Sequence, residues 1–204
     1  MGASPRTARG RVTRERIVRA ASELVAERGV AGTSLDDVRE QAHVSKSQLY
    51  LYFADKEALL REVAEATCDT VIDAQAEILA GFDSLAGIER YLDALVELQV
   101  QRRGHGGCPI GSLAGQLVER DEAARGILAD GLERWESGLR EGLEAMAERG
   151  RLKPQADPGL LANQTLALLQ GGLLLAQVRR DPGQMRIAAD AVLALVREAV
   201  RPSR

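Results

Sequence analysis

The chain has 204 residues, of which 45% are hydrophobic and 3% aromatic, and its formal net charge at pH 7 is −3. This length allows one domain or two small ones with a sizeable core, and the charge excludes a chain that is basic throughout. The two cysteines, Cys68 and Cys108, lie far apart and form no C-x-x-C pair. Neither a disulfide framework nor a zinc motif is therefore indicated.

Ala, Leu, Gly, Glu and Arg dominate the composition, which favours helices and predicts an all-α fold. The N-terminus lacks the apolar stretch of a signal peptide. The longest apolar run, residues 166–176, is interrupted by Gln170 and is too short to span a bilayer. We therefore expect a soluble, cytoplasmic protein.

The N-terminal segment is basic although the whole chain is slightly acidic. Residues 1–19 contain one acidic residue, Glu15, and six arginines: Arg6, Arg9, Arg11, Arg14, Arg16 and Arg19. We expect residues 1–12 to form a flexible basic arm. A basic arm on an acidic body is typical of nucleic-acid binding, and a solvated tail without a partner is the alternative.

The first predicted helix covers residues 13–28, with Thr13 as its cap. Gly29 fits the left-handed position that ends a helix. The apolar side chains recur at the helical spacing of 3.6 residues, at Ile17, Ala20, Ala21, Leu24 and Val25.

A second helix is predicted over residues 35–42. Ser34 precedes it, and Asp37 stands where a capping box needs its second member, although Asp is shorter than the usual Glu or Gln. His43 and Val44 follow as a tight turn.

The stretch 44–53 predicts a third, short helix. Ser45 and Gln48 form an S-x-x-Q capping box, while Leu49 and Phe53 point inward one turn apart. The other face carries hydrogen-bond donors and flat rings: Lys46, Ser47, Gln48, Tyr50 and Tyr52. Such a face suits a groove lined by phosphates and base edges, and helix, turn and second helix together are typical of a helix-turn-helix.

About nine helices are expected in all, with no segment of strand periodicity. A helix capped by Asp55 runs to about residue 81, and breaks at 150–158 and 179–183 separate the last three. The other predicted helices cover residues 84–103, 110–119, 122–148, 159–178 and 184–200.

Residues 32–60, G-T-S-L-D-D-V-R-E-Q-A-H-V-S-K-S-Q-L-Y-L-Y-F-A-D-K-E-A-L-L, resemble the N-terminal motif of the TetR family of bacterial transcriptional regulators. His43 replaces the glycine usual there, so a slightly strained turn is expected. The resemblance implies a helix-turn-helix DNA-binding domain at 13–57. It also implies a helical effector-binding and dimerisation domain at 58–204.

The resemblance also assigns roles to single residues. Thr33 and Ser34 are expected to contact phosphate, and Tyr50, Tyr52 and Lys56 the DNA backbone. Lys46, Ser47 and Gln48 are the expected base readers, because lysine suits guanine acceptors and glutamine suits adenine. Taken singly, each polar side chain could equally belong to a solvated helix face.

Residues 159–178 are apolar almost all round, which indicates burial on both sides. Gly171 and Gly172 in mid-helix make sense if another helix crosses closely there. We expect a homodimer built from residues 159–178 and 185–200, and the alternative is the core of a monomer.

Four residues are candidates for ligand binding: Cys108, Trp135, Gln164 and Gln170. Trp135 shares a helix face with three glycines, which indicates either tight packing or a cavity wall. The two glutamines lie in an apolar helix and need partners, across a dimer or on a ligand. Cys108, near His105, is either a redox sensor or a packed, inert cysteine. We expect a pocket of modest polarity with one Trp and few charges, which favours an apolar or aromatic effector.

The leading hypothesis is a ligand-responsive regulator whose dimer reads a pseudo-palindromic operator. Only the habit of the family favours a repressor released by its effector over an activator. The alternatives are a thiol-redox sensor acting through Cys108 and a helical bundle that has lost DNA binding. No catalytic triad, carboxylate pair or metal cluster stands out, so we expect neither an enzyme nor a cofactor.

Overall fold

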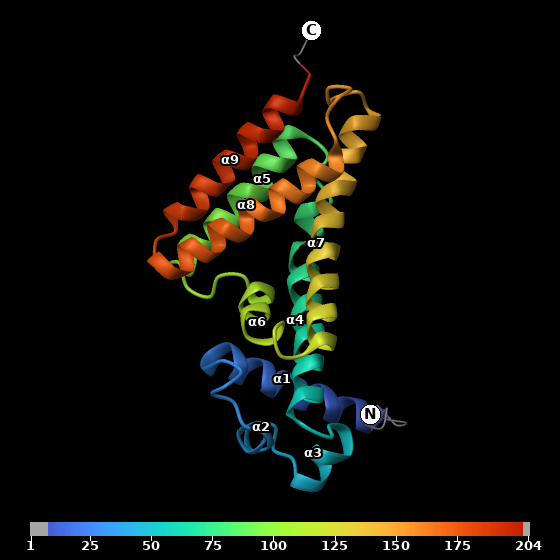
Figure 1. The fold of residues 1–204 in the computed structure, drawn as a ribbon, viewed down its shortest axis with the longest axis vertical. Coiled ribbons are helices and arrows are strands. Elements are labelled where there is room, and N and C mark those ends of the chain that lie inside the picture. Colours follow the sequence, from blue (N-terminus) through green and yellow to red (C-terminus); the bar gives the residue numbers. More distant parts are fainter. Residues whose placement is uncertain (1–7, 202–204) are drawn as a thin grey trace. The chain divides into compact units, whose positions relative to one another are not determined.

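The computed structural model describes residues 8–201 and confirms an all-α fold (Figure 1). Apart from one isolated antiparallel bridge between Leu152 and Val200, these residues contain no β-structure. The helices are α1 (Ala8–Arg28), α2 (Leu35–Gln41), α3 (Lys46–Tyr52), α4 (Lys56–Leu79), α5 (Leu85–Gln101), α6 (Pro109–Leu117), α7 (Glu122–Glu148), α8 (Pro158–Arg179) and α9 (Gly183–Ala199).

The first helix begins earlier than predicted. Residues 8–12 belong to α1, so that part of the expected flexible arm is wrong, and residues 1–7 lie outside the described residues. Thr13 is not a cap, because its hydroxyl lies inside the helix and donates to the carbonyl of Arg9 at 3.0 Å. Alanine and arginine are strong helix formers, which explains why the helix continues to Ala8.

The chain divides into two compact units. The first contains the described residues up to Thr70 together with Ser112–Gly131, and the second contains Val71–Gly111 and the described residues from Leu132 on. Helices α4, α6 and α7 contribute to both units. The boundary expected after residue 57 falls at the start of α4, whereas the units divide that helix at Thr70.

In the first unit, α2 packs against both α1 and α3. The turn between α2 and α3 contains His43 with φ of 50°, which confirms the expected left-handed backbone. The core under these helices is formed by apolar side chains that are almost completely buried: Ile17, Ala21, Leu24, Val38, Leu49, Phe53, Leu59 and Val63.

Two polar contacts hold the second segment of this unit to the first. The side-chain oxygen of Gln116 accepts from the backbone N–H of Val30 at 2.8 Å. Arg61 donates to Asp121 at 2.8 Å. Both contacts join residues more than 50 positions apart, so they fix the base on which α3 is presented.

In the second unit, α5 and α8 both pack against α9 (Figure 1). Asp157 caps α8 through the N–H groups of Gly159 and Leu160, and Arg180 ends it with a left-handed backbone. Among the described helices, α8 is the one long and apolar enough to cross a membrane by length and composition. About half of it faces its own unit, since 44% of its most apolar window is buried.

Candidate functional site

Both helices of the helix-turn-helix begin with a complete capping box, as predicted. Ser34 Oγ accepts from the Asp37 N–H at 3.1 Å, and an Asp37 carboxylate oxygen accepts from the Ser34 N–H at 2.9 Å. At α3, Ser45 Oγ accepts from the Gln48 N–H at 3.2 Å, and Gln48 Oε1 accepts from the Ser45 N–H at 2.9 Å. Helices of seven residues are marginal alone, so these reciprocal bonds define where each begins.

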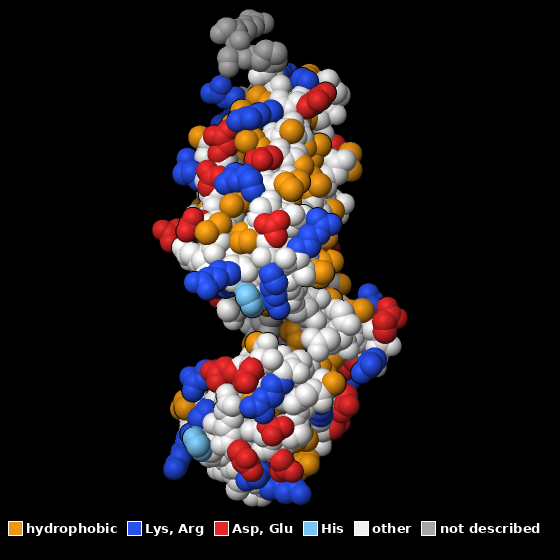
Figure 2. All heavy atoms as spheres, turned by 90° about the vertical axis from the view of Figure 1, so that its left-hand side faces the viewer, with side chains coloured by type: hydrophobic (Ala, Val, Ile, Leu, Met, Phe, Trp, Pro, Cys, Tyr) orange, Lys and Arg blue, Asp and Glu red, His pale blue; other side chains and the backbone are white. Residues whose placement is uncertain are grey.

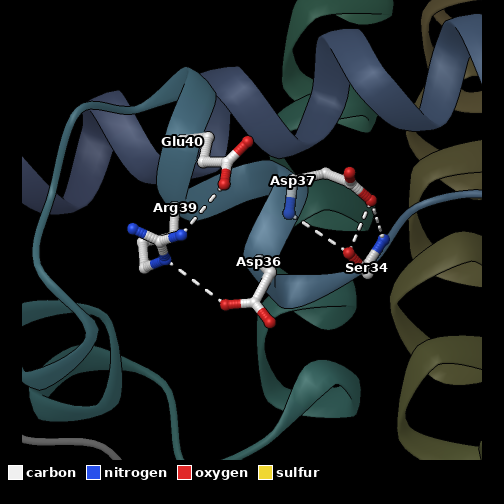
Figure 3. A network of polar contacts seen from close by, with 5 residues as sticks. All are labelled: Ser34, Asp36, Asp37, Arg39 and Glu40. Atoms are coloured by element: carbon white, nitrogen blue, oxygen red, sulfur yellow. Dashed lines mark hydrogen bonds and ion pairs between the residues drawn. The ribbon is translucent and has the colours of Figure 1, made fainter.

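Figure 3 shows how α2 uses its charged side chains. The Ser34 hydroxyl donates to Asp37 at 2.5 Å, and this bond, followed by the backbone bond from Ser34, lowers the pKa of the Asp37 carboxyl. Arg39 contacts Asp36 at 3.3 Å and Glu40 at 3.0 Å. The Ser34 proton is thus already engaged, and a phosphate contact by this hydroxyl requires a rearranged cap.

Helix α3 presents its polar face to solvent, while Leu49 and Phe53 are buried beneath it. Tyr52 is partly exposed, and the Lys46 ammonium lies 6.0 Å from the centre of the Tyr50 ring. The exposed residues of this helix include Lys46, Ser47, Gln48 and Tyr50. The two turns of α3 therefore present hydrogen-bond donors and the Tyr50 ring to solvent on one short helix.

Gln48 is less free than its exposure indicates. Its carbonyl oxygen is used in the capping box, whereas an adenine contact through both amide groups requires oxygen and nitrogen together. The capped state leaves only Nε2 to donate to a base acceptor.

Two residues expected to contact phosphate are bound within the fold. Thr33 is buried and its hydroxyl donates to the Gly29 carbonyl at 2.9 Å. Lys56 is partly buried, and its ammonium donates to the Val30 carbonyl at 2.7 Å. Both close the loop that follows α1, so their placement gives them a structural role and provides no support for DNA contact.

Leu51 was missed by the sequence analysis. It is 58% exposed, although it lies on a helix of seven residues between two tyrosines. An exposed leucine beside the residues expected to read bases is of a type that can contact the methyl group of thymine. The signal was present in the sequence, because Leu51 does not share the face of Leu49 and Phe53.

The amino end of α1 adds positive charge to the first unit. Arg9, Arg11, Arg16 and Arg19 are exposed and have no acidic partner among the described residues. Arg14 differs from them because it pairs with Glu62 and lies 5.7 Å from the centre of the Phe53 ring. Since Phe53 directly follows α3, this contact places a turn of α1 beside the end of the recognition helix.

In the second unit, Trp135 belongs to a buried chain of hydrogen bonds. Its indole N–H donates to the Tyr91 hydroxyl at 2.8 Å, which donates to Gln75 Oε1 at 2.6 Å. Burial raises the pKa of Tyr91, so the phenol stays neutral. A Cβ on Gly142 would lie 2.6 Å from the Phe82 carbonyl oxygen, so tight packing explains that glycine on the Trp135 helix.

Cys108 and Gln170 lie together, and Gln164 lies apart from them. Gln170 Nε2 and the Gly111 N–H each approach Cys108 Sγ at 3.4 Å. Gln164 is exposed. Its predicted role in a ligand site inside one subunit therefore has no support, and it belongs instead to the outer face of α8.

Comparison with known proteins gives two matches along the chain. Residues 17–63 match the model of the bacterial regulatory proteins of the tetR family, and residues 84–192 match the tetracyclin repressor-like C-terminal domain. Over 177 residues the chain is 31% identical to an HTH-type transcriptional regulator in the lacX 3′ region of Lactococcus lactis subsp. lactis, covering 84% of this chain and 86% of that protein. The chain belongs to the tetR family.

Other tetR-family relatives match over most of their length. The transcriptional repressor DhaR of Mycobacterium sp. strain GP1 is 26% identical over 192 residues, which is 93% of each chain. A tetR-family regulator from Cytophaga hutchinsonii has the same fold, with a TM-score of 0.83, 18% identity, and coverage of 98% of this chain and 100% of that one. The protein is therefore a DNA-binding transcriptional regulator, and members of this family are generally not enzymes.

Two buried polar residues of this tetR-family chain were also missed by the sequence analysis. Gln99 on α5 and Thr165 on α8 are completely buried, yet their side-chain polar atoms have no hydrogen-bond partner among the described residues. Gln99 stands in line with Leu92 and Leu95, so helical spacing alone could have placed an amide in the core.

Proposed function

We propose that this protein is a homodimeric repressor that leaves a pseudo-palindromic operator when a small molecule binds its second unit. The proposal rests on α3, a capped helix with a buried side formed by Leu49 and the following Phe53. Its solvent-exposed polar face carries Lys46, Ser47, Gln48 and Tyr50. Such a helix fits the major groove, where base edges present donors and acceptors. A role on DNA implies a cytoplasmic protein.

The outer face of α8 supports the dimer. Figure 2 shows hydrophobic side chains among charged ones on the surface of the second unit. On α8, exposed apolar residues follow the spacing of a helix-packing seam at Leu174 and Val178, with Gly171 on the same face, and Ile187 is exposed on α9. Exposed apolar residues on adjacent helices indicate a surface that a partner covers. In the proposed dimer, that partner is a second copy of the chain, and residues 159–178 and 185–200 form the interface.

Repression is supported by the similarity of the chain to DhaR, which is a transcriptional repressor. Release follows when an effector prefers a conformation in which the two α3 helices no longer match the half-sites. This needs different affinities for the two conformations. Of the ligand residues predicted from the sequence, we retain Trp135, Cys108 and Gln170, and the contact between the last two supports grouping them.

The test is a titration of the DNA upstream of its own gene with the wild type, Lys46→Ala and Tyr50→Ala at several salt concentrations. We expect each variant to bind about 5- to 100-fold more weakly at unchanged Tm, and a steep loss of wild-type affinity with salt. Glu57→Ala is the control, because Glu57 is also exposed but lies in the first turn of α4 and not on the polar face of α3. Wild-type affinity in both variants would refute the proposed DNA-binding face.

A second candidate is a thiol sensor, favoured by the two N–H groups that approach Cys108 Sγ. With hydrogen peroxide, the sulfur attacks one oxygen, the O–O bond breaks, and the products are sulfenic acid and water. If this is the signal, peroxide releases the wild type from DNA and does not release Cys108→Ser. Equal release of both proteins excludes it.

A further inference from the structure

Gln99 is an exception among the buried polar residues. Its side chain is 0% exposed, and neither its amide nitrogen nor its carbonyl oxygen has a partner among the described residues. Most buried polar side chains in native proteins are hydrogen-bonded, because an unpaired one loses its hydration without compensation. Two unpaired atoms on one buried amide therefore require an explanation.

Gln75, in the same unit, shows how a buried glutamine is normally accommodated. Its nitrogen donates to the Val71 carbonyl at 3.1 Å, and its oxygen accepts from Tyr91 at 2.6 Å. This unit thus pairs both the nitrogen and the oxygen of one buried amide and leaves both atoms of the other unpaired.

Thr165 repeats the pattern on α8. Helical threonines of this chain donate to the carbonyl four residues back, as Thr67 does to Val63 and Thr70 to Ala66, each at 2.7 Å. Thr165 is 0% exposed, and its hydroxyl has no partner among the described residues. Its own helix could have satisfied the hydroxyl but does not.

Gln99 and Thr165 both lie on the buried sides of helices that pack against α9. Gln99 belongs to α5, and Thr165 to α8. The turn that follows α5 lies against the last part of α8, because a Cβ on Gly104 would lie 2.7 Å from the Ala176 carbonyl oxygen. The segment that follows brings Cys108 to Gln170 of α8.

The chemistry of these groups restricts the ligand. The buried polar residues of the described chain are Thr33, Gln75, Gln99 and Thr165, and none of them is charged. An ionised ligand would therefore be buried without a counter-charge, which is strongly unfavourable. A primary amide presents a donor beside an acceptor, and its complement is a group of the same kind.

We propose that Gln99 and Thr165 recognise the effector, and that the effector is an uncharged molecule with an apolar body and a carboxamide-like group. This inference rests on the proposed function, because it names the ligand of the same regulator. The unpaired atoms of Gln99 take the donor and acceptor of the ligand, and the Thr165 hydroxyl takes a further polar atom. The alternative is that ordered water alone satisfies both residues.

Three probes of similar shape separate these possibilities: benzamide, benzoate and toluene. Their binding to the full-length protein without DNA is measured by ligand-detected NMR, for the wild type, Gln99→Leu, Thr165→Val and Gln75→Leu. We expect the wild type to prefer benzamide to benzoate. Gln99→Leu should bind benzamide at least tenfold more weakly and toluene unchanged, and Thr165→Val should weaken benzamide in the same direction.

Thermal unfolding of the same proteins gives a second readout. Gln99→Leu removes an unpaired amide and should melt at or above the wild-type Tm, by up to about 2–4 °C. Gln75→Leu breaks two hydrogen bonds and should melt lower. A ligand role thus combines lost benzamide binding with retained stability.

Three results would overturn the inference: benzamide binding that is equal in the wild type and Gln99→Leu, a preference for benzoate, or a lower Tm of Gln99→Leu with unchanged binding, which indicates water alone. DNA binding is measured separately on the wild type. Absent DNA binding with Gln99-dependent benzamide binding contradicts the proposed regulator but still supports a ligand site at Gln99.

Discussion

Gly172 of α8 lies so close to Ala188 of α9 that a Cβ at position 172 would be 2.5 Å from the Ala188 Cβ. Real side chains do not approach each other so closely, so the α8–α9 pair depends on this glycine. Gly171 beside it is exposed and has open space where its Cβ would lie. Gly172 therefore permits a close contact between helices of the same chain, whereas Gly171 faces outward.

The Gly172→Ala variant should be less stable by about 1–3 kcal/mol, because the added methyl group overpacks the α8–α9 contact. Chemical denaturation measures the change. Gly126→Ala on α7 is the control, since nothing lies within 4 Å of that Cβ, and it should gain up to about 1 kcal/mol. Ala188→Gly added to Gly172→Ala should restore part of the loss, and an unchanged loss would contradict the packing account.

The Leu174→Arg variant should be a folded monomer that has lost operator binding. Leu174 is exposed on the outer face of α8, and a buried arginine at a homodimer seam has no counter-charge. Light scattering after size exclusion measures the mass, and circular dichroism measures the helix content. Val100→Arg on α5 is the matched control, because Val100 is also apolar and is exposed to a similar extent. A dimeric Leu174→Arg protein would place the interface elsewhere.

Leu51 should read thymine through its methyl group. Replacing the thymines of the protected site by deoxyuridine removes those methyls and should weaken wild-type binding roughly fivefold, on the order of 1 kcal/mol. Leu51→Ala should bind the normal site more weakly by a similar factor and respond little to the replacement. Additive losses in the double comparison would show that Leu51 contacts something other than thymine.

Asp121 should contribute stability that depends on pH. The N–H of Ala124 donates to it at 3.0 Å and Arg61 donates at 2.8 Å. The Ala124 bond, and then Arg61, lower the pKa of Asp121 below its ordinary value of 3.8. The contribution is therefore complete above that value and is lost as the pH falls through the lower pKa of the folded state.

The Asp121→Ala variant should accordingly lose about 1–2 kcal/mol at pH 7, and the difference from the wild type should shrink below pH 3.8. Denaturation at a series of pH values measures it. Glu122→Ala removes an exposed contact with Arg125, and because water screens such a pair it should leave stability nearly unchanged. A difference that is constant with pH would rule out the ionised carboxylate as its cause.

Short-range signals in the sequence were sufficient for the helix-turn-helix. Ser34 with Asp37 and Ser45 with Gln48 identify the two helix starts because a capping box lies within four residues. The start of α1 was missed because a short-range signal was misleading. Thr13 is a plausible cap by residue type, but its hydroxyl donates to the Arg9 carbonyl inside the helix.

The candidate site was harder to predict wherever it depends on which face of a helix is covered. Because α8 is apolar almost all round, its sequence does not show that Gln164 is outside and Thr165 inside. Thr33 and Lys56 matched the expected motif, yet their partners Gly29 and Val30 are backbone carbonyls. The conformation of that loop, and hence those contacts, is set by tertiary structure.

In the proposed complex, two copies of α3 held by one dimer occupy successive major grooves of the operator. The most direct measurement is the affinity for DNA whose two half-sites, found by footprinting, are separated by zero, five or ten additional base pairs. Five base pairs, half a helical turn, should reduce binding to the non-specific level because the second α3 then faces the wrong side of the duplex. Equal affinity for all three spacings would contradict simultaneous binding of the two half-sites by one dimer.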